Sequence, residues 1–184
     1  MCPNSIGRNR RSAEPGSVPI TIRDAEEHDL AAIAAIFNLE VTESAYVYVE
    51  TPLTLDDRRS WLAMHRSAGL SVLVATDAAN TTEVLGWASL SPYRPATGYR
   101  FTVEASVYVA RSAHRRGIGR RLLAALEDAA KARGVHAIVA SIDSENTPSI
   151  ELFDRFGYVE AARLYEVGRK FEQWRTQLLL LKRF

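Results

Sequence analysis

Apolar and polar residues alternate most regularly over residues 103–109, where every second side chain is apolar. A period of two predicts a strand with one face packed on a hydrophobic core. The other face of this strand then carries Glu104, Ser106 and Tyr108. We expect this second face, with its carboxylate and two hydroxyl groups, to point at a cleft.

Six further strands follow from shorter alternating or apolar runs. They are expected at residues 20–23, 71–76, 84–90, 136–142, 158–165 and 174–181. The turn-rich stretch 77–82 joins two of these runs, which are therefore expected to form a hairpin. The run at 136–142 is nearly all apolar, as is typical of a strand buried on both faces.

Helical spacing of apolar residues predicts four helices. The first is expected to follow an N-cap at Asp24, and the second to run from a Thr54 cap through Arg66. The third begins in a basic turn and ends at Gly134, and the fourth spans residues 146–156. On the second helix the expected buried side chains are Leu55, Trp61 and Leu62. These elements predict a mixed α/β (α+β) domain with about seven strands and four helices.

The composition indicates one globular domain. The 184 residues are 47% hydrophobic and 24% charged, which excludes a disordered chain. Residues 1–18 contain proline, glycine and arginine without an apolar run, so we expect a disordered tail ahead of a domain over 19–184. A formal net charge of +1 argues against a nucleic acid or an anionic membrane as the partner.

Cysteine and histidine usage narrows the chemistry. Cys2 is the only cysteine, which excludes an intramolecular disulfide and a cysteine-based zinc site. The four histidines are scattered singly, so we expect no metal. The longest apolar run, residues 178–181, is far shorter than the roughly 20 residues that cross a bilayer. We therefore expect a cytoplasmic protein with no membrane partner.

A basic turn with two glycines follows the strand 103–109, and it reads His114-Arg115-Arg116-Gly117-Ile118-Gly119-Arg120. Glycine lets a backbone approach a ligand closely, and a helix N-terminus offers unpaired N–H groups that suit phosphate. With Arg121 the segment carries four arginines and no acid. These features indicate a pyrophosphate site, and a solvated basic helix start fits the same spacing equally well.

This turn resembles the acyl-CoA signature of the GCN5-related N-acetyltransferase (GNAT) superfamily, which is Gln/Arg-x-x-Gly-x-Gly/Ala between a strand and a helix. His114 stands where that family usually has Gln or Arg. Residues 146–158 are similar to the family's Asn-x-x-Ser-x-x-Leu segment, in which Asn146 would contact the pantetheine or the backbone beside it. Taken alone, Asn146 is a typical helix N-cap.

The resemblance extends from residue 20 to the end of the chain. Residues 91–95, 99, 102–109 and 168–174 are similar to the phosphinothricin and methionine sulfoximine acetyltransferase branch. Enzymes of this branch acetylate the α-amino group of small amino-acid analogues. Ala96 stands where the branch usually carries an arginine, so Arg94 or Arg100 would have to hold a substrate carboxylate.

The resemblance implies a GNAT fold, with a mixed, mostly antiparallel seven-stranded sheet between about four helices, and acetyl-CoA as co-substrate. Glu104 becomes the general base, acting through water, and a backbone N–H near Val109 would meet the oxyanion. Tyr108 is either a proton donor or a packing partner of the pantetheine. Phe153 stands where many relatives have a tyrosine that protonates the leaving thiolate.

The site residues implied by the resemblance fall into two groups. Those expected to bind the cofactor are Val107, Tyr108, Val109, Arg115, Arg116, Gly117, Ile118, Gly119, Arg120, Asn146, Ser149 and Phe153. Those expected to bind the amine substrate are Tyr93, Arg94, Tyr99 and Glu104. Relatives are commonly homodimers, and the late strands would support one.

Three alternatives stay open at this point. The same fold could acetylate a peptide or protein amine, or bind acyl-CoA without catalysis. A nucleic-acid module using the arginine-rich turn is the third, and it predicts binding with a steep salt dependence.

Overall fold

The computed structural model describes residues 19–184, so the predicted tail over 1–18 lies outside the described residues. Seven strands form one sheet in the order β1-β2-β3-β4-β5-β7-β6. Every neighbouring pair is antiparallel except β4 and β5, which are parallel. The strands are β1 Ile20–Asp24, β2 Val72–Asp77, β3 Val84–Pro92, β4 Thr102–Val109, β5 Ala137–Asp143, β6 Val159–Lys170 and β7 Gln173–Arg183.

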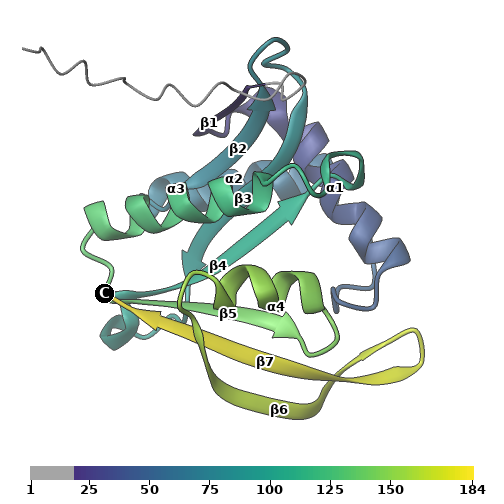
Figure 1. Cartoon of the computed structure of the whole chain (residues 1–184), viewed down its shortest axis with the longest axis vertical. Coiled ribbons are helices and arrows are strands. Elements are labelled where there is room, and N and C mark those ends of the chain that lie inside the picture. Colours follow the sequence, from purple (N-terminus) through teal and green to yellow (C-terminus); the bar gives the residue numbers. More distant parts are fainter. Residues whose placement is uncertain (1–18) are drawn as a thin grey trace, which may run out of the picture.

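Four α-helices cover the sheet, which confirms the predicted fold class. They are α1 Leu30–Glu43, α2 Leu55–Ser67, α3 Ile118–Ala132 and α4 Thr147–Asp154. Figure 1 shows α3 and α4 in front of the sheet, with α1 and α2 behind it. A short 3-10 helix, Thr97–Tyr99, lies in the connection from β3 to β4, and another, Arg111–Ala113, follows β4.

Each face of the sheet carries its own hydrophobic cluster. On the α3 side, Leu122 and Leu126 are fully buried in a cluster that also holds Val103 and Ala105 of β4. This confirms the apolar face predicted for residues 103–109. Tyr108 instead packs on the smaller cluster of α1 and α2, so the polar face of β4 looks toward those helices. Both faces of β4 thus contact a hydrophobic cluster, and the polar face does so through Tyr108.

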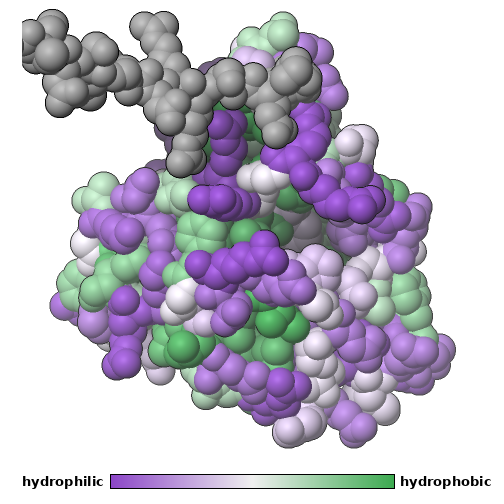
Figure 2. Space-filling view, in the orientation of Figure 1, coloured by the Kyte–Doolittle hydropathy of each residue, from purple (hydrophilic) through white to green (hydrophobic). Residues whose placement is uncertain are grey.

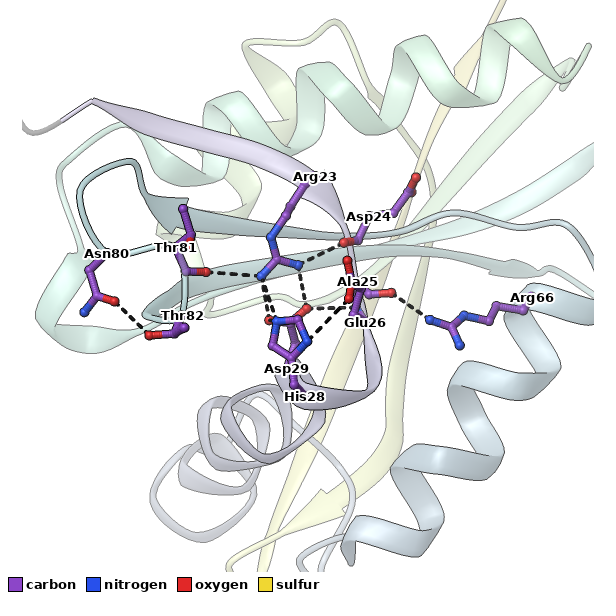
Figure 3. Close-up of polar contacts among 10 residues, drawn as sticks. All are labelled: Arg23, Asp24, Ala25, Glu26, His28, Asp29, Arg66, Asn80, Thr81 and Thr82. Atoms are coloured by element: carbon purple, nitrogen blue, oxygen red, sulfur yellow. Dashed lines mark hydrogen bonds and ion pairs between the residues drawn. The ribbon is translucent and has the colours of Figure 1, made fainter.

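The predicted N-cap at Asp24 is wrong, because Asp24 is the last residue of β1. The chain turns through a short 3-10 helix, and Asp29 takes over the polar contacts (Figure 3). Its carboxylate is almost fully buried, accepts two hydrogen bonds from Arg23 at 2.7 and 2.8 Å, and accepts a third from the Glu26 backbone N–H. Arg23 also donates to the Thr81 carbonyl, which ties β1 to α1 and to the β2–β3 turn.

The α2 helix begins with the predicted Thr54 cap, whose hydroxyl accepts from the Asp57 N–H. Leu62 is buried as expected, and Trp61 is half-buried. Leu55 is 39% exposed, so its predicted burial is wrong. Leu55 is the first residue of α2, and the buried face of the helix begins one turn later at Arg58. The buried residues of α2 are Arg58, Leu62 and His65, and two of these three are polar.

The β6–β7 hairpin is longer than predicted. Phe171 and Glu172 form its turn, and both have positive φ values, 47° and 63°. A two-residue turn of this kind usually contains Asn-Gly or a related pair, which the sequence lacks here. The two strands continue to Lys170 and from Gln173, where the strands predicted over 158–165 and 174–181 leave a gap.

Candidate active site

The decisive feature of the sheet is a change in the pairing of β4. On one edge β4 pairs with β3 from Val103 to Val109. On the other it pairs with β5 only over residues 102–104, and the two strands then diverge (Figure 1). Among the described strands, none pairs with this edge of β4 beyond Glu104. An extended ligand with amide groups can pair with such a free edge as another strand would.

Figure 2 shows recessed, partly hydrophobic surface in the middle of this face of the molecule. A cavity of about 260 Å³ lies between the second half of α1 and the end of β4. Arg111, just after β4, donates to Glu40 at 3.1 Å and also pairs with Glu43, both on α1. These ion pairs fix α1 across the end of the strand. The cavity is lined by Ala35, Ile36, Leu39, Glu40, Val109, Ala110, Arg111 and Ser112.

The predicted basic turn leads from β4 into α3. His114 lies close to β4, because its Nε2 donates to the Val109 carbonyl at 3.1 Å. Gly117 directly precedes α3 with φ of 73°, a conformation that favours glycine, and a Cβ there would meet nothing within 4 Å. The first N–H groups of α3 have no partner within the helix. Open space, free N–H groups and the exposed side chains of Arg115, Arg116 and Arg120 fit a pyrophosphate.

The two glycines of the turn have different roles. A Cβ at Gly119 would lie 3.3 Å from Leu152 Cδ2 of α4 and 3.7 Å from Val109 Cγ2. The space beside Gly119 is therefore taken by α4 and β4, and this glycine allows α3 to approach them closely. Gly117 is the one that leaves room for a ligand.

The opposite face of β4 carries Glu104, Ser106 and Tyr108, all half-buried. The Tyr108 ring stacks on Trp87 at 4.6 Å and meets Phe37 edge-on at 5.4 Å. Burial raises the pKa of Tyr108 to about 12, so the phenol keeps its proton at neutral pH. Glu104 and Tyr108 thus place a proton acceptor and a proton donor on one face.

Three of the four residues predicted to bind the substrate, Tyr93, Arg94 and Tyr99, lie in the β3–β4 connection, and Glu104 lies near the start of β4. The rings of Tyr93 and Tyr99 meet edge-on at 5.6 Å, and the Arg94 guanidinium lies 5.1 Å from the Tyr93 ring. Ser91 at the end of β3 is the register partner of Glu104, so this connection begins beside that carboxylate. The structure thus brings all four predicted substrate residues to one end of the sheet.

The residues predicted on and before α4 have structural roles of two kinds, a helix cap and a core contact. The Asn146 side chain accepts from the Ser149 N–H at 3.3 Å, which confirms its role as a helix cap. Phe153 is 2% exposed and meets Tyr158 edge-on at 4.9 Å in the core. Contacts of these residues with a cofactor stay predictions.

Sequence reasoning missed two buried polar residues of α2, Arg58 and His65, which turn toward the same cluster as Tyr108. The available signal was their helical spacing with Trp61 and Leu62. Over residues 19–184, no group of three or more His, Cys, Asp or Glu side chains is placed to hold a metal. No helix in this part of the chain is long and apolar enough to span a membrane.

The profile of the acetyltransferase (GNAT) family matches residues 33–158, which include β4, the basic turn, α3 and α4. The chain belongs to the GNAT family. The resemblance inferred from the turn and from residues 146–158 is therefore confirmed.

Individual relatives within the GNAT family carry names that specify a substrate. The L-methionine sulfoximine/L-methionine sulfone acetyltransferase of Pseudomonas paraeruginosa is 43% identical over 154 residues, which are 84% of this chain and 88% of that protein. The phosphinothricin N-acetyltransferase of Streptomyces coelicolor is 39% identical over 161 residues, covering 87% of this chain and 94% of that protein.

A solved GNAT structure shows the same architecture. It is a phosphinothricin acetyltransferase from Sinorhizobium meliloti in complex with acetyl-CoA, with a TM-score of 0.85 and 29% identity. The match covers 90% of this chain and 88% of that one. The similarity to the phosphinothricin and methionine sulfoximine branch is confirmed.

Proposed function

We propose that this GNAT enzyme transfers the acetyl group of acetyl-CoA to the primary amine of a small amino-acid-like substrate, of the phosphinothricin or methionine sulfoximine type. The names of relatives up to 43% identical support this substrate class. The observation that carries the proposal is the free edge of β4, with Glu104 at its start and the open Gly117 turn beyond its end.

The residues present fit acetyl-CoA. The edge from Val107 to Val109 would pair with the pantetheine, and the N–H groups from Arg115 to Arg120 would hold the pyrophosphate. Asn146, Ser149 and Phe153 complete the predicted contacts from the α4 side. When bound, acetyl-CoA supplies a thioester carbonyl that an amine can attack and a thiol whose pKa, about 8.5, allows departure as thiolate.

Glu104 is assigned the proton transfer. A primary amine is mostly protonated near neutral pH, so a base must remove a proton before the nitrogen can attack. Glu104 is half-buried on the polar face of β4, where it can accept that proton directly or through water. Tyr108, which keeps its proton, is available as a donor on the same face.

Arg94 and Arg100 are the candidate partners of a substrate carboxylate. Both are exposed and flank the 3-10 helix Thr97–Tyr99 between β3 and β4. The Arg100 guanidinium lies 4.4 Å from the Phe101 ring and donates to the Thr97 carbonyl. Arg94 rests on Tyr93, another predicted substrate residue, so it is the better placed of the two.

The test is release of CoA thiol from acetyl-CoA, measured across free amino acids, methionine sulfoximine, phosphinothricin and short peptides. Glu104→Gln is expected to lower kcat by about 10²-fold or more, since loss of a general base usually costs that much. Unchanged turnover in this variant removes Glu104 from the mechanism. Turnover of peptides alone contradicts the proposed substrate class.

A matched pair of glycine variants tests the cofactor site. Gly117 and Gly134 flank the two ends of α3, both have positive φ, and neither has any atom within 4 Å of an added Cβ. Gly117→Val and Gly134→Val are therefore expected to lose similar stability, of the order of 1–2 kcal/mol. Only Gly117→Val should weaken acetyl-CoA binding, measured by calorimetry. Equal affinity in the two variants would show that the turn is not the pyrophosphate site.

The proposal includes a homodimer formed through the β6–β7 hairpin. Toward its turn the hairpin exposes Tyr165, Val167, Phe171 and Trp174 by 73%, 55%, 54% and 62%, and large apolar side chains exposed on one hairpin are typical of an interaction surface. A second copy of the chain would cover it. Sedimentation should show a dimer that the double variant Tyr165→Glu, Trp174→Glu dissociates, whereas a monomeric wild type contradicts this part.

The proposal also includes a location. Acetyl-CoA is an intracellular metabolite, so we place the enzyme in the cytoplasm, with neither nucleic acid nor membrane as its partner.

A further inference from the structure

The starting point is His65 of α2, which is completely buried. Its Nδ1 lies 2.8 Å from the Trp61 carbonyl oxygen, and a carbonyl only accepts, so Nδ1 carries a proton. Burial lowers the pKa of His65, and the nearby Arg58 charge acts in the same direction. The ring is therefore neutral, and its Nε2 is a hydrogen-bond acceptor.

That acceptor determines the orientation of Ser91. The Ser91 Oγ lies 3.1 Å from His65 Nε2, so the serine hydroxyl donates its only proton to the ring. The lone pairs of Oγ remain free for another donor. Ser91 itself is half-buried at the end of β3, unlike the histidine that orients it.

Ser91 is also the register partner of Glu104 in the β3–β4 ladder. Side chains at partner positions of antiparallel strands project on the same face, with Cβ atoms roughly 5 Å apart. This face therefore presents two acceptors beside each other, the Glu104 carboxylate and the Ser91 oxygen. Two neighbouring acceptors suit a ligand group that carries several N–H bonds, such as a primary ammonium.

We propose that Ser91 is the second hydrogen-bond acceptor for the ammonium group of the substrate, and that His65 is the positioning residue that keeps the serine proton turned away. The inference rests on the proposed function. When Glu104 takes the proton, one N–H bond breaks, an O–H bond forms and the electron pair stays on nitrogen. A second N–H of the amine continues to donate a hydrogen bond to Ser91 Oγ, which holds the nitrogen in place for attack.

Steady-state kinetics of the purified enzyme test this role. Ser91→Ala should raise KM for the amine about tenfold or more, because the charged ammonium loses one of its two hydrogen-bond acceptors. KM for acetyl-CoA should not change, and kcat should change less than KM, since the contact exists before and during the reaction. Ser91→Thr keeps the hydroxyl and should restore the wild-type KM.

Ser89→Ala is the matched control. Ser89 lies two residues earlier on β3, is 2% exposed and faces Ser106 rather than Glu104. Its loss should leave KM for the amine unchanged.

The histidine is tested by its own pair of variants and by a spectroscopic readout. His65→Gln can place an acceptor near the position of Nε2 and should keep KM within about threefold of wild type, whereas His65→Leu should reproduce the Ser91→Ala increase. In nitrogen NMR of the folded wild type, His65 should show a proton on Nδ1 and none on Nε2 at neutral pH.

The outcomes separate the two levels of the proposal. An unchanged amine KM in Ser91→Ala, or a proton on Nε2 of His65, overturns the role of Ser91 while the acetyltransferase function stands. Absence of thiol release by the wild type with every amine overturns the function and this inference together.

Discussion

Two arginines are buried in this protein in opposite ways. Arg175 of β7 is 5% exposed and donates to Asp143 at 2.7 and 2.9 Å and to Glu145 at 2.9 Å. Arg58 of α2 is 3% exposed, and its Nε and Nη2 have no hydrogen-bond partner among the described residues. Its guanidinium instead lies 4.3 to 5.3 Å from the ring centroids of Phe37, Trp61 and Trp87.

Different kinds of interaction stabilise the two regions. Hydrogen bonds are directional, and those around Asp143 connect the end of β5 to β7 and, through the Tyr48 hydroxyl at 2.9 Å, to the segment between α1 and α2. Contacts between a cation and aromatic rings are less directional, so they fill space around Tyr108 without fixing a strand register. Arg175 is a structural residue, whereas Arg58 provides a positive charge beneath the polar face of β4.

Removal of the buried partner of Arg175 should lower the stability of the protein most. Asp143→Ala leaves the Arg175 guanidinium buried with only Glu145 as partner, and it should lower the free energy of unfolding by about 3–5 kcal/mol. Glu145→Ala is the control, because the Glu145 side chain is 68% exposed, and it should cost less than about 1 kcal/mol. Urea unfolding measures both. Similar losses in the two variants would show that burial does not decide the strength of this pair.

The second effect depends on pH. Burial pushes the pKa of Asp143 up, but hydrogen bonds from Arg175, the Glu145 N–H and Tyr48 outweigh it and hold the pKa below its usual range. The unfolded chain therefore binds the proton first as pH falls. The stabilisation by Asp143 is complete above its unfolded pKa of about 3.9 and is lost as pH falls through the folded pKa.

The measurement is urea unfolding of wild type and Asp143→Asn between pH 7 and pH 3. The difference in stability between them should be constant at the upper end and shrink toward pH 3. A second lowered carboxyl, Asp29 beside Arg23, is present in both proteins and cancels in the difference. A difference independent of pH would contradict the lowered pKa of Asp143.

Replacement of Arg58, which has no carboxylate partner within residues 19–184, should change the stability of the protein least. Arg58→Met keeps the packing and removes two buried nitrogen atoms whose N–H groups have no partner in the described part of the chain, and each of these nitrogens costs the wild-type protein about 1–3 kcal/mol. The lost cation–aromatic attraction is about 2 kcal/mol. We therefore expect the free energy of unfolding to rise by about 2 kcal/mol at pH 7 and by more at pH 4, because the Arg58 charge no longer lowers the pKa of the buried His65. A clear loss of stability would show that the aromatic contacts outweigh the unsatisfied groups.

Some features of the fold and the candidate site could be predicted from the sequence, and others could not. The alternation over 103–109 located Glu104 on the polar face, and the turn after it located Gly117, because both signals lie within a few consecutive residues. The Asp24 cap was wrong, since the ion pair of Arg23 with Asp29 and the strand pairing of Asp24 with Leu73 are decided outside the local window. The hairpin turn at Phe171 was missed because its residues carry no turn signal.

The amino-acid order alone determined the strands, the helices, the family motifs and which residues could do chemistry, because each depends on neighbours a few positions apart. Tertiary structure alone decided that β4 separates from β5 after Glu104, that Gly119 packs while Gly117 stays open, and that His65 turns Ser91 toward itself beside Glu104. The physical reason is that strand pairing and the burial of polar side chains join residues far apart in the chain, and their hydrogen-bond partners exist only once the sheet has formed.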